Sequence, residues 1–156
     1  MGFFLSERSK EKLVGVHQDL VNVVERAIDY TPVDFGVTYG VRTLEEQEQL
    51  VAQGRSQTMK SKHLLQEDGH SHAVDLVAYF GSDISWELNV YDDIADAMAR
   101  AARELDVAIK WGAAWSEGDI RFYEGSAEDA MNAYIDLRRS QGRRPFIDAP
   151  HFELMM

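Results

Sequence analysis

The stretch HAVDLVAYF, residues 72–80, has the β-branched and aromatic residues of a buried strand, but a carboxylate interrupts it. Side chains alternate across a strand, so Asp75 shares a face with Ala73 and Val77, and His72 faces the other way. Burying an unpaired carboxylate is costly. Asp75 therefore needs a hydrogen-bond donor, a cation or a metal ion beside it. Asp75 could therefore be a structural residue with hydrogen-bond partners, or it could be a metal ligand.

Patterns on both sides of this strand predict a mixture of helices and strands. Apolar residues recur at three- and four-residue steps in the predicted helices, and Thr43 and Glu46 have the spacing of a capping box. The predicted helices are 6–29 (in two pieces), 43–54, 90–107 and 126–144, the strands are 33–41, 72–80, 108–111 and 151–154, and 55–71 is an irregular loop. Because these elements do not alternate as βαβ units, they predict an α+β fold around a small, largely antiparallel sheet.

The composition narrows the class of protein. A chain of 156 residues with 45% hydrophobic residues predicts one domain, 1–156, with a substantial core. The net charge of −11 argues against nucleic-acid binding through phosphate neutralisation. The chain has no cysteine, so histidines and carboxylates are its only strong metal ligands. We find neither a secretory signal nor a membrane-length apolar run, and we expect no stable membrane association.

Histidines and acids gather in two places. Three of the five histidines lie in SKHLLQEDGHSHAVDL, residues 61–76. The second place is DAPHFEL, where His151 and Glu153 share a strand face and Asp148 precedes His151 by three positions. Pro150 keeps the backbone between them extended, so Asp148 can lie near a metal held by His151 without ligating it.

Two histidines and a carboxylate from different parts of the chain form a candidate metal site. His63, Asp75 and His151 form such a set. Three protein ligands with an open fourth position are typical of catalytic zinc, whereas structural zinc is closed by four. A nearby carboxylate such as Asp148 would then accept a proton during attack on a carbonyl.

The motifs YGVRTLEEQ, GRSQTMKSKHL, HAVDLVAY, IKWG and DAPHFEL, in this order, resemble the M15 zinc metallopeptidases. The similarity is greatest to the L-alanyl-D-glutamate endopeptidase subgroup, which includes many phage endolysins, and it runs through nearly the whole chain. It implies a hedgehog/DD-peptidase-like domain with Zn²⁺ bound by His63, Asp75 and His151. It also implies Asp148 as the catalytic base and Arg42 as the residue that steadies the substrate carbonyl.

The sequence departs from this family in two places. LQEDG, after SKHL, separates His63 from Asp75 more widely than is usual, which makes His70 a competitor for the ligand role; the preceding Ser61 favours His63. Residues 116–145 replace a short connection with a helical insertion, which we expect to cap or flank the cleft without supplying ligands. We expect Trp111 and Trp115 to belong to the cleft wall and core, and not to a stacking platform for substrate.

The resemblance implies an endolysin that cleaves the L-alanyl-D-glutamate bond of peptidoglycan stem peptides and lyses the host. Such a monomeric enzyme would collect in the host bacterial cytoplasm and, once released, act on the periplasmic cell wall. A D-alanyl-D-alanine carboxypeptidase or dipeptidase of the same family is the alternative. A non-catalytic zinc-stabilised wall-binding or virion module is a third hypothesis, although such a module needs neither Asp148 nor Arg42.

Overall fold

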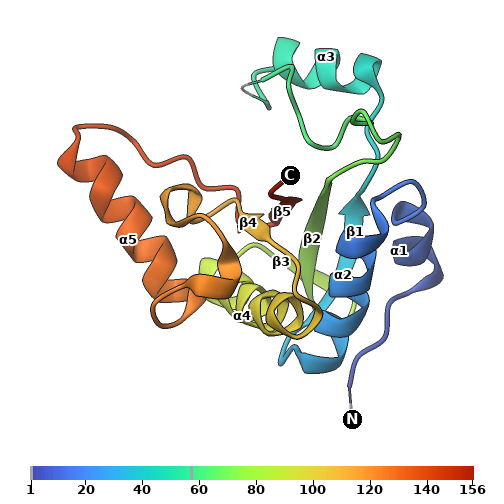
Figure 1. Ribbon diagram of the computed structural model, residues 1–156, viewed down its shortest axis with the longest axis horizontal. Coiled ribbons are helices and arrows are strands. Elements are labelled where there is room, and N and C mark those ends of the chain that lie inside the picture. The colour runs from blue at the N-terminus through green and yellow to red at the C-terminus, as the bar shows by residue number, and fades with distance from the viewer. Residues whose placement is uncertain (1, 57) are drawn as a thin grey trace.

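The computed structural model describes residues 2–56 and 58–156 (Figure 1). Met1 and Gln57 lie outside this description, Gln57 within the predicted loop of 55–71. The helices in the described residues are α1 (Glu7–Lys12), α2 (Gln18–Tyr30), α3 (Leu44–Ala52), α4 (Leu88–Leu105) and α5 (Ala127–Ser140), with short 3₁₀ turns η1 (Trp115–Glu117) and η2 (Ile120–Phe122). The predicted first helix is thus two helices, as expected. None of the helices in the described residues is long and apolar enough to cross a membrane.

The sheet is built around β2 (Ala73–Phe80), which lies between neighbours on both edges. Along one edge runs β1 (Asp34–Tyr39); along the other lie β5 (His151–Leu154) and β3 (Asp83–Ser85), with β4 (Ile109–Trp111) outside β5. All these pairs are antiparallel, which confirms the predicted α+β class. The sequence did not predict β3, because three residues with one apolar side chain carry no usable alternation.

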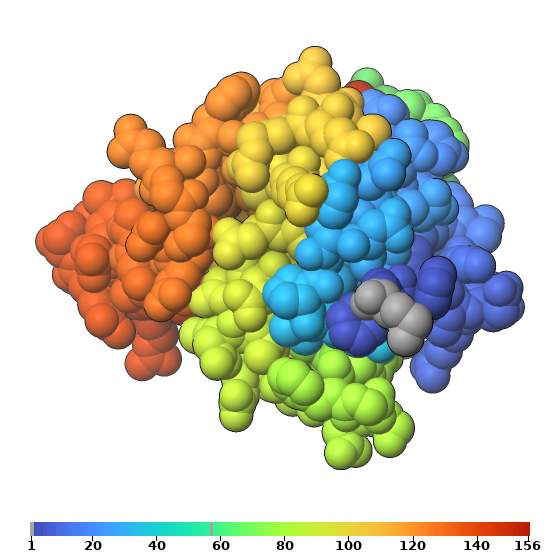
Figure 2. Space-filling model, turned by 90° about the horizontal axis from the view of Figure 1, so that it is seen from below, coloured from blue at the N-terminus to red at the C-terminus, as the bar shows by residue number. Residues whose placement is uncertain are grey.

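The two faces of β2 have different partners, as alternation predicts. Val74, Leu76 and Ala78 are fully buried members of the main core. α2 and α4 pack against each other, and α4 contacts β2. Figure 2 shows the helical side of the molecule, with α4 between α2 and the segment that carries α5. Asp75, one residue out of phase, therefore belongs to the opposite face of the sheet.

The strand register determines what lies beside Asp75. In the antiparallel pair of β2 and β5, Asp75 is directly opposite His151. Opposite residues on antiparallel strands project on the same face, with Cβ atoms about 5 Å apart. Two residues far apart in sequence are thus neighbours because of the sheet, before any side-chain interaction is considered.

The predicted capping residues form their caps, whereas several element boundaries differ from the prediction by a few residues. Thr43 and Glu46 form the predicted capping box at the start of α3, and Ser126 and Asp129 form another at α5. Each such cap is worth about 1 kcal/mol. The prediction of a helix to residue 144 is wrong: α5 ends at Ser140, because Gly142 takes a left-handed backbone conformation with φ of 69°.

Candidate metal centre

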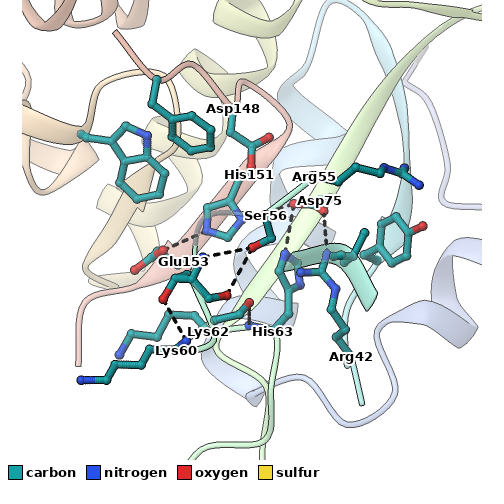
Figure 3. Close-up of a pocket in the computed structure, with 16 residues that line it drawn as sticks. Arg42, Arg55, Ser56, Lys60, Lys62, His63, Asp75, Asp148, His151 and Glu153 are labelled. Carbon is teal, nitrogen blue, oxygen red and sulfur yellow. Dashed lines mark hydrogen bonds and ion pairs between the residues drawn. The ribbon is translucent and has the colours of Figure 1, made fainter. Parts of the chain in front are cut away.

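His63, Asp75 and His151 come together on the face of the sheet opposite Val74 and Leu76 (Figure 3). His63 Nε2 lies 3.2 Å from Asp75 Oδ1, and His151 Nδ1 lies 3.3 Å from the same oxygen. One ligand atom from each residue falls within 4.8 Å of the others. Two ligands that each lie about 2.1 Å from a tetrahedral zinc ion are about 3.4 Å apart. The three side chains therefore fit a single metal ion without rearrangement of the backbone.

The loop before β2 holds His63 by its backbone and its ring. The His63 backbone N–H donates to Ser61 Oγ (3.1 Å), and its carbonyl accepts from the Arg42 N–H (2.9 Å). His63 Nδ1 lies 2.9 Å from the Gly40 carbonyl oxygen, and the residue is only 2% exposed. A carbonyl can only accept, so Nδ1 carries the proton in the neutral ring and Nε2 presents its lone pair to the cluster.

The second imidazole is oriented by Glu153, to which the sequence analysis assigned no role. His151 Nε2 lies 2.9 Å from Glu153 Oε1. Donation from Nε2 to this carboxylate leaves the Nδ1 lone pair for the cluster, an arrangement that also makes the imidazole a more basic ligand. The available signal was the two-residue spacing of His151 and Glu153, which places both side chains on one face of β5.

The other histidines of the 61–76 stretch lie elsewhere. The exposed His70 ring packs edge-on against His17 with centroids 5.9 Å apart. His72 Nε2 bonds to Asp68 Oδ2 at 2.7 Å. In the described part of the chain, His63, Asp75 and His151 are the only group of three close enough to share an ion. The structure thus brings His63, and not His70, to Asp75, while the role of these residues as ligands stays a prediction.

Asp148 lines the same cavity, on the turn that leads into β5. The prediction of an extended backbone between Asp148 and His151 is wrong, because residues 149 and 150 form a turn. Its backbone N–H donates to the Gly112 carbonyl (2.8 Å), and its own carbonyl accepts from the His151 N–H (3.0 Å). A Cβ atom at Gly112 would lie 2.3 Å from the Asp148 carbonyl oxygen, so only glycine allows this approach. The end of β4 therefore fixes the position of Asp148 beside His151.

Arg42 reaches the cluster from the other side. Its side chain is almost fully buried, with Nη2 3.8 Å from Asp75 Oδ2 and its guanidinium over the Tyr39 ring. Arg42 Nη1 donates to Gln47 Oε1 at 2.8 Å, and the fully buried Gln47 in turn donates to Ser56 Oγ. The sequence analysis did not find this role of Gln47, because a polar residue inside a helical pattern gives no sign of a buried partner.

The charges in the cluster stabilise one another. Burial alone would raise the pKa of Asp75, but the charge on His63 and the hydrogen bond from His151 outweigh it and hold the pKa far below its usual range. Burial lowers the pKa of His151, yet its hydrogen bonds to Asp75 and Glu153 raise it to about 10. Burial and the charge of Asp75 raise the pKa of Asp148.

Comparison with known proteins identifies the group to which this site belongs. Residues 1–155 match a family described as phage L-alanyl-D-glutamate peptidase. The chain belongs to this family. The L-alanyl-D-glutamate peptidase of Escherichia phage T5 is 30% identical over 120 residues, which cover 74% of this chain and 84% of that protein.

A solved structure agrees over nearly the full length of the peptidase. The crystal structure of the Serratia marcescens L-Ala D-Glu endopeptidase ChiX matches with a TM-score of 0.72 and 34% identity, covering 99% of this chain and 91% of that one. These matches confirm the predicted family, the fold and the assignment as a peptidase. They do not favour the D-alanyl-D-alanine alternative.

The cavity of the peptidase has a volume of about 560 Å³, within the usual range for small-ligand sites. Trp115 and Phe146 stack at 6.4 Å and form its aromatic wall, with the Trp115 ring 5.6 Å from that of His151. Trp111 is fully buried, so of the two tryptophans Trp111 belongs to the core and Trp115 to the cavity wall. The predicted insertion of 116–145 contributes no lining residue, although the residues immediately before and after it do.

Proposed function

We propose that this peptidase is a zinc-dependent endolysin that cleaves the L-alanyl-D-glutamate bond of peptidoglycan stem peptides. The observation that carries the proposal is the convergence of two imidazole nitrogens on one carboxylate oxygen, in a cavity that also contains Asp148 and Arg42. The choice of bond is supported by the family description and by the names of the phage T5 and Serratia marcescens proteins.

His63 Nε2, one Asp75 oxygen and His151 Nδ1 are the proposed zinc ligands. This nitrogen and oxygen set is one that zinc accepts, and three protein ligands leave the fourth position for water or substrate. Bound there, zinc would act as a Lewis acid that makes water nucleophilic near neutral pH. Gly40 and Glu153 hold the two rings in the tautomers that such binding requires.

Asp148 is the proposed general base. Its carboxylate is near the cluster but outside the group of possible ligands, so it is available to take a proton from the attacking water. Because burial raises its pKa, it holds that proton more readily than an exposed aspartate. The same proton can then pass to the leaving nitrogen of D-glutamate when the peptide bond breaks.

Arg42 is the proposed group that stabilises the developing negative charge on the carbonyl oxygen. Its bond to Gln47 occupies Nη1 and fixes the plane of the guanidinium, which leaves Nη2 directed at the Asp75 side of the cavity. A positively charged donor that is already oriented stabilises the transition state without a reorganisation cost.

The proposed biological setting follows from the endolysin assignment. The enzyme collects in the host cytoplasm, reaches the periplasmic wall after a separate permeabilisation of the membrane, and acts there as a monomer. This cavity is lined by all the proposed catalytic groups from one chain, so the chemistry needs no second copy.

Removal of the metal is expected to abolish wall digestion and to lower the melting temperature. A ligand that binds only the folded state at 1,000 times its Kd adds about 4 kcal/mol of stability. In a domain of this size that corresponds to a shift of roughly 10 °C. Purified sacculi should lose turbidity with zinc-loaded protein, resist chelated protein and clear again after zinc is restored. Undiminished digestion by protein that metal analysis shows to be zinc-free would refute the metal mechanism.

A further inference from the structure

The cavity concentrates positive charge in a strongly acidic protein. The chain carries a net charge of −11, yet four cationic side chains line this one cavity: Arg42, Arg55, Lys60 and Lys62. The carboxylates that line it all belong to the metal centre or its immediate partners, namely Asp75, Asp148 and Glu153. Away from the metal centre, every charged group on the cavity wall is therefore a cation.

Three of these cations have no anionic partner within the protein. Arg55, Lys60 and Lys62 lie between α3 and His63, and we call the described residues 55–56 and 58–62 the cationic segment. Every acidic residue of the chain is in the described part, and none comes within 4.0 Å of their charged nitrogens. Arg121, by contrast, is held by Asp119 and Asp106. The charges of the cationic segment are thus not used to hold the fold together.

The lysines are placed beside the metal centre. In Figure 3, Lys60 and Lys62 extend in the same direction on the Glu153 side of the histidines, and Arg55 lies on the side of Asp75. The three cationic side chains therefore line the same cavity as the metal centre and Glu153.

The proposed substrate has a negatively charged group close to the bond that is cleaved. A D-glutamate whose nitrogen is acylated by L-alanine keeps two carboxyl groups, and only one of them can carry the peptide onward. The other is a free carboxylate, separated from the scissile nitrogen by a few bonds. Taking it into a cavity requires charged or hydrogen-bonding partners, which lysine and arginine provide.

We propose that the cationic segment binds the free carboxylate of D-glutamate, with Lys60 and Lys62 as its main contacts, and thereby selects substrates with an unamidated residue after the scissile bond. This inference rests on the proposed cleavage of the L-alanyl-D-glutamate bond. Because these unpaired cations lie on the wall of one cavity beside the metal centre, we expect them to recognise a small anionic group of the peptide that enters it.

Two peptides test the inference. Both are N-acylated L-Ala-D-Glu substrates, identical except that the free D-glutamate carboxylate of one is a primary amide in the other. Wild-type, zinc-loaded enzyme should cleave the carboxylate form with a kcat/KM at least about tenfold higher, equivalent to 1.4 kcal/mol. The double variant Lys60→Gln/Lys62→Gln should reduce this preference to about twofold, mainly through KM. Arg55→Gln should have a smaller effect in the same direction.

Matched controls distinguish a loss of carboxylate recognition from a general loss of folding or of zinc. Lys10→Gln, on the exposed surface of α1, should keep the wild-type preference, and the double variant should keep its zinc. Ionic strength of about 1 M, where the Debye length is about 3 Å, should raise KM for the carboxylate peptide only. Equal cleavage of both peptides by the wild type, or an equal loss on both in the double variant, would overturn the inference alone. No cleavage of either peptide would overturn the proposed function and the inference with it.

Discussion

Replacement of Asp148 by asparagine is expected to lower turnover by about two to four orders of magnitude while zinc stays bound. Asparagine has nearly the same shape, and the backbone bonds from residue 148 to Gly112 and His151 do not depend on the side chain. The amide cannot accept the proton of the attacking water, so the loss should appear in kcat and leave KM nearly unchanged. Steady-state kinetics on an L-Ala-D-Glu peptide and the zinc content per chain measure both quantities.

His151→Ala is the matched comparison for this variant. It removes a proposed ligand and should lose both zinc affinity and activity, since it leaves Asp75 with one imidazole partner in place of two. Loss of metal from Asp148→Asn would make Asp148 a ligand and not a base. Unchanged turnover in that variant would mean that another group accepts the proton.

The second large effect is expected at His63, and its control is His70. Loss of a residue that only hydrogen-bonds to a metal ligand already lowers metal affinity by about 10- to 100-fold. His63 is a proposed ligand itself, so His63→Ala should weaken zinc binding by more than about 100-fold. His70→Ala should change zinc affinity by less than about twofold, because the exposed His70 ring packs against His17, away from Asp75. Competition with a chromophoric chelator gives the two dissociation constants.

The outcome of this pair also tests the loop after His63. If His70→Ala emptied the site and His63→Ala did not, the loop of residues 64–70 would have to refold to exchange the two rings. The left-handed conformation of Gly69 (φ of 82°) and the bond from Gln66 N–H to the His70 carbonyl hold this loop outward. We therefore expect loop shortening between these residues to leave zinc affinity intact.

The local sequence pattern was sufficient to predict most helices and strands. It also predicted which residues share a face in two of the strands. Alternation placed Asp75 on the face opposite Val74 and Leu76, and it placed His151 with Glu153. The pairing of β2 with β5, which joins residues 76 positions apart, leaves no local trace. The assignment of His63 over His70 therefore depended on the family resemblance, and the structure supplied the geometric reason.

The features that the sequence did not reveal depend on tertiary contacts. Gln47 and Glu153 acquire their roles from the side chains that the fold brings to them, Arg42 and His151. The cationic segment was interpreted only as part of an irregular loop, because a lysine in a loop gives no indication of the cavity that it lines. β3 and the end of α5 were missed or misplaced because short strands and helix ends carry the weakest sequence signals.

Mass spectrometry of the wall fragments tests the central claim most directly. Sacculi digested by the zinc-loaded protein are predicted to release stem peptides that begin with a free D-glutamate amine. The glycan-linked remnants should end in L-alanine. Release of terminal D-alanine, with the L-alanyl-D-glutamate bond intact in every fragment, would contradict the account.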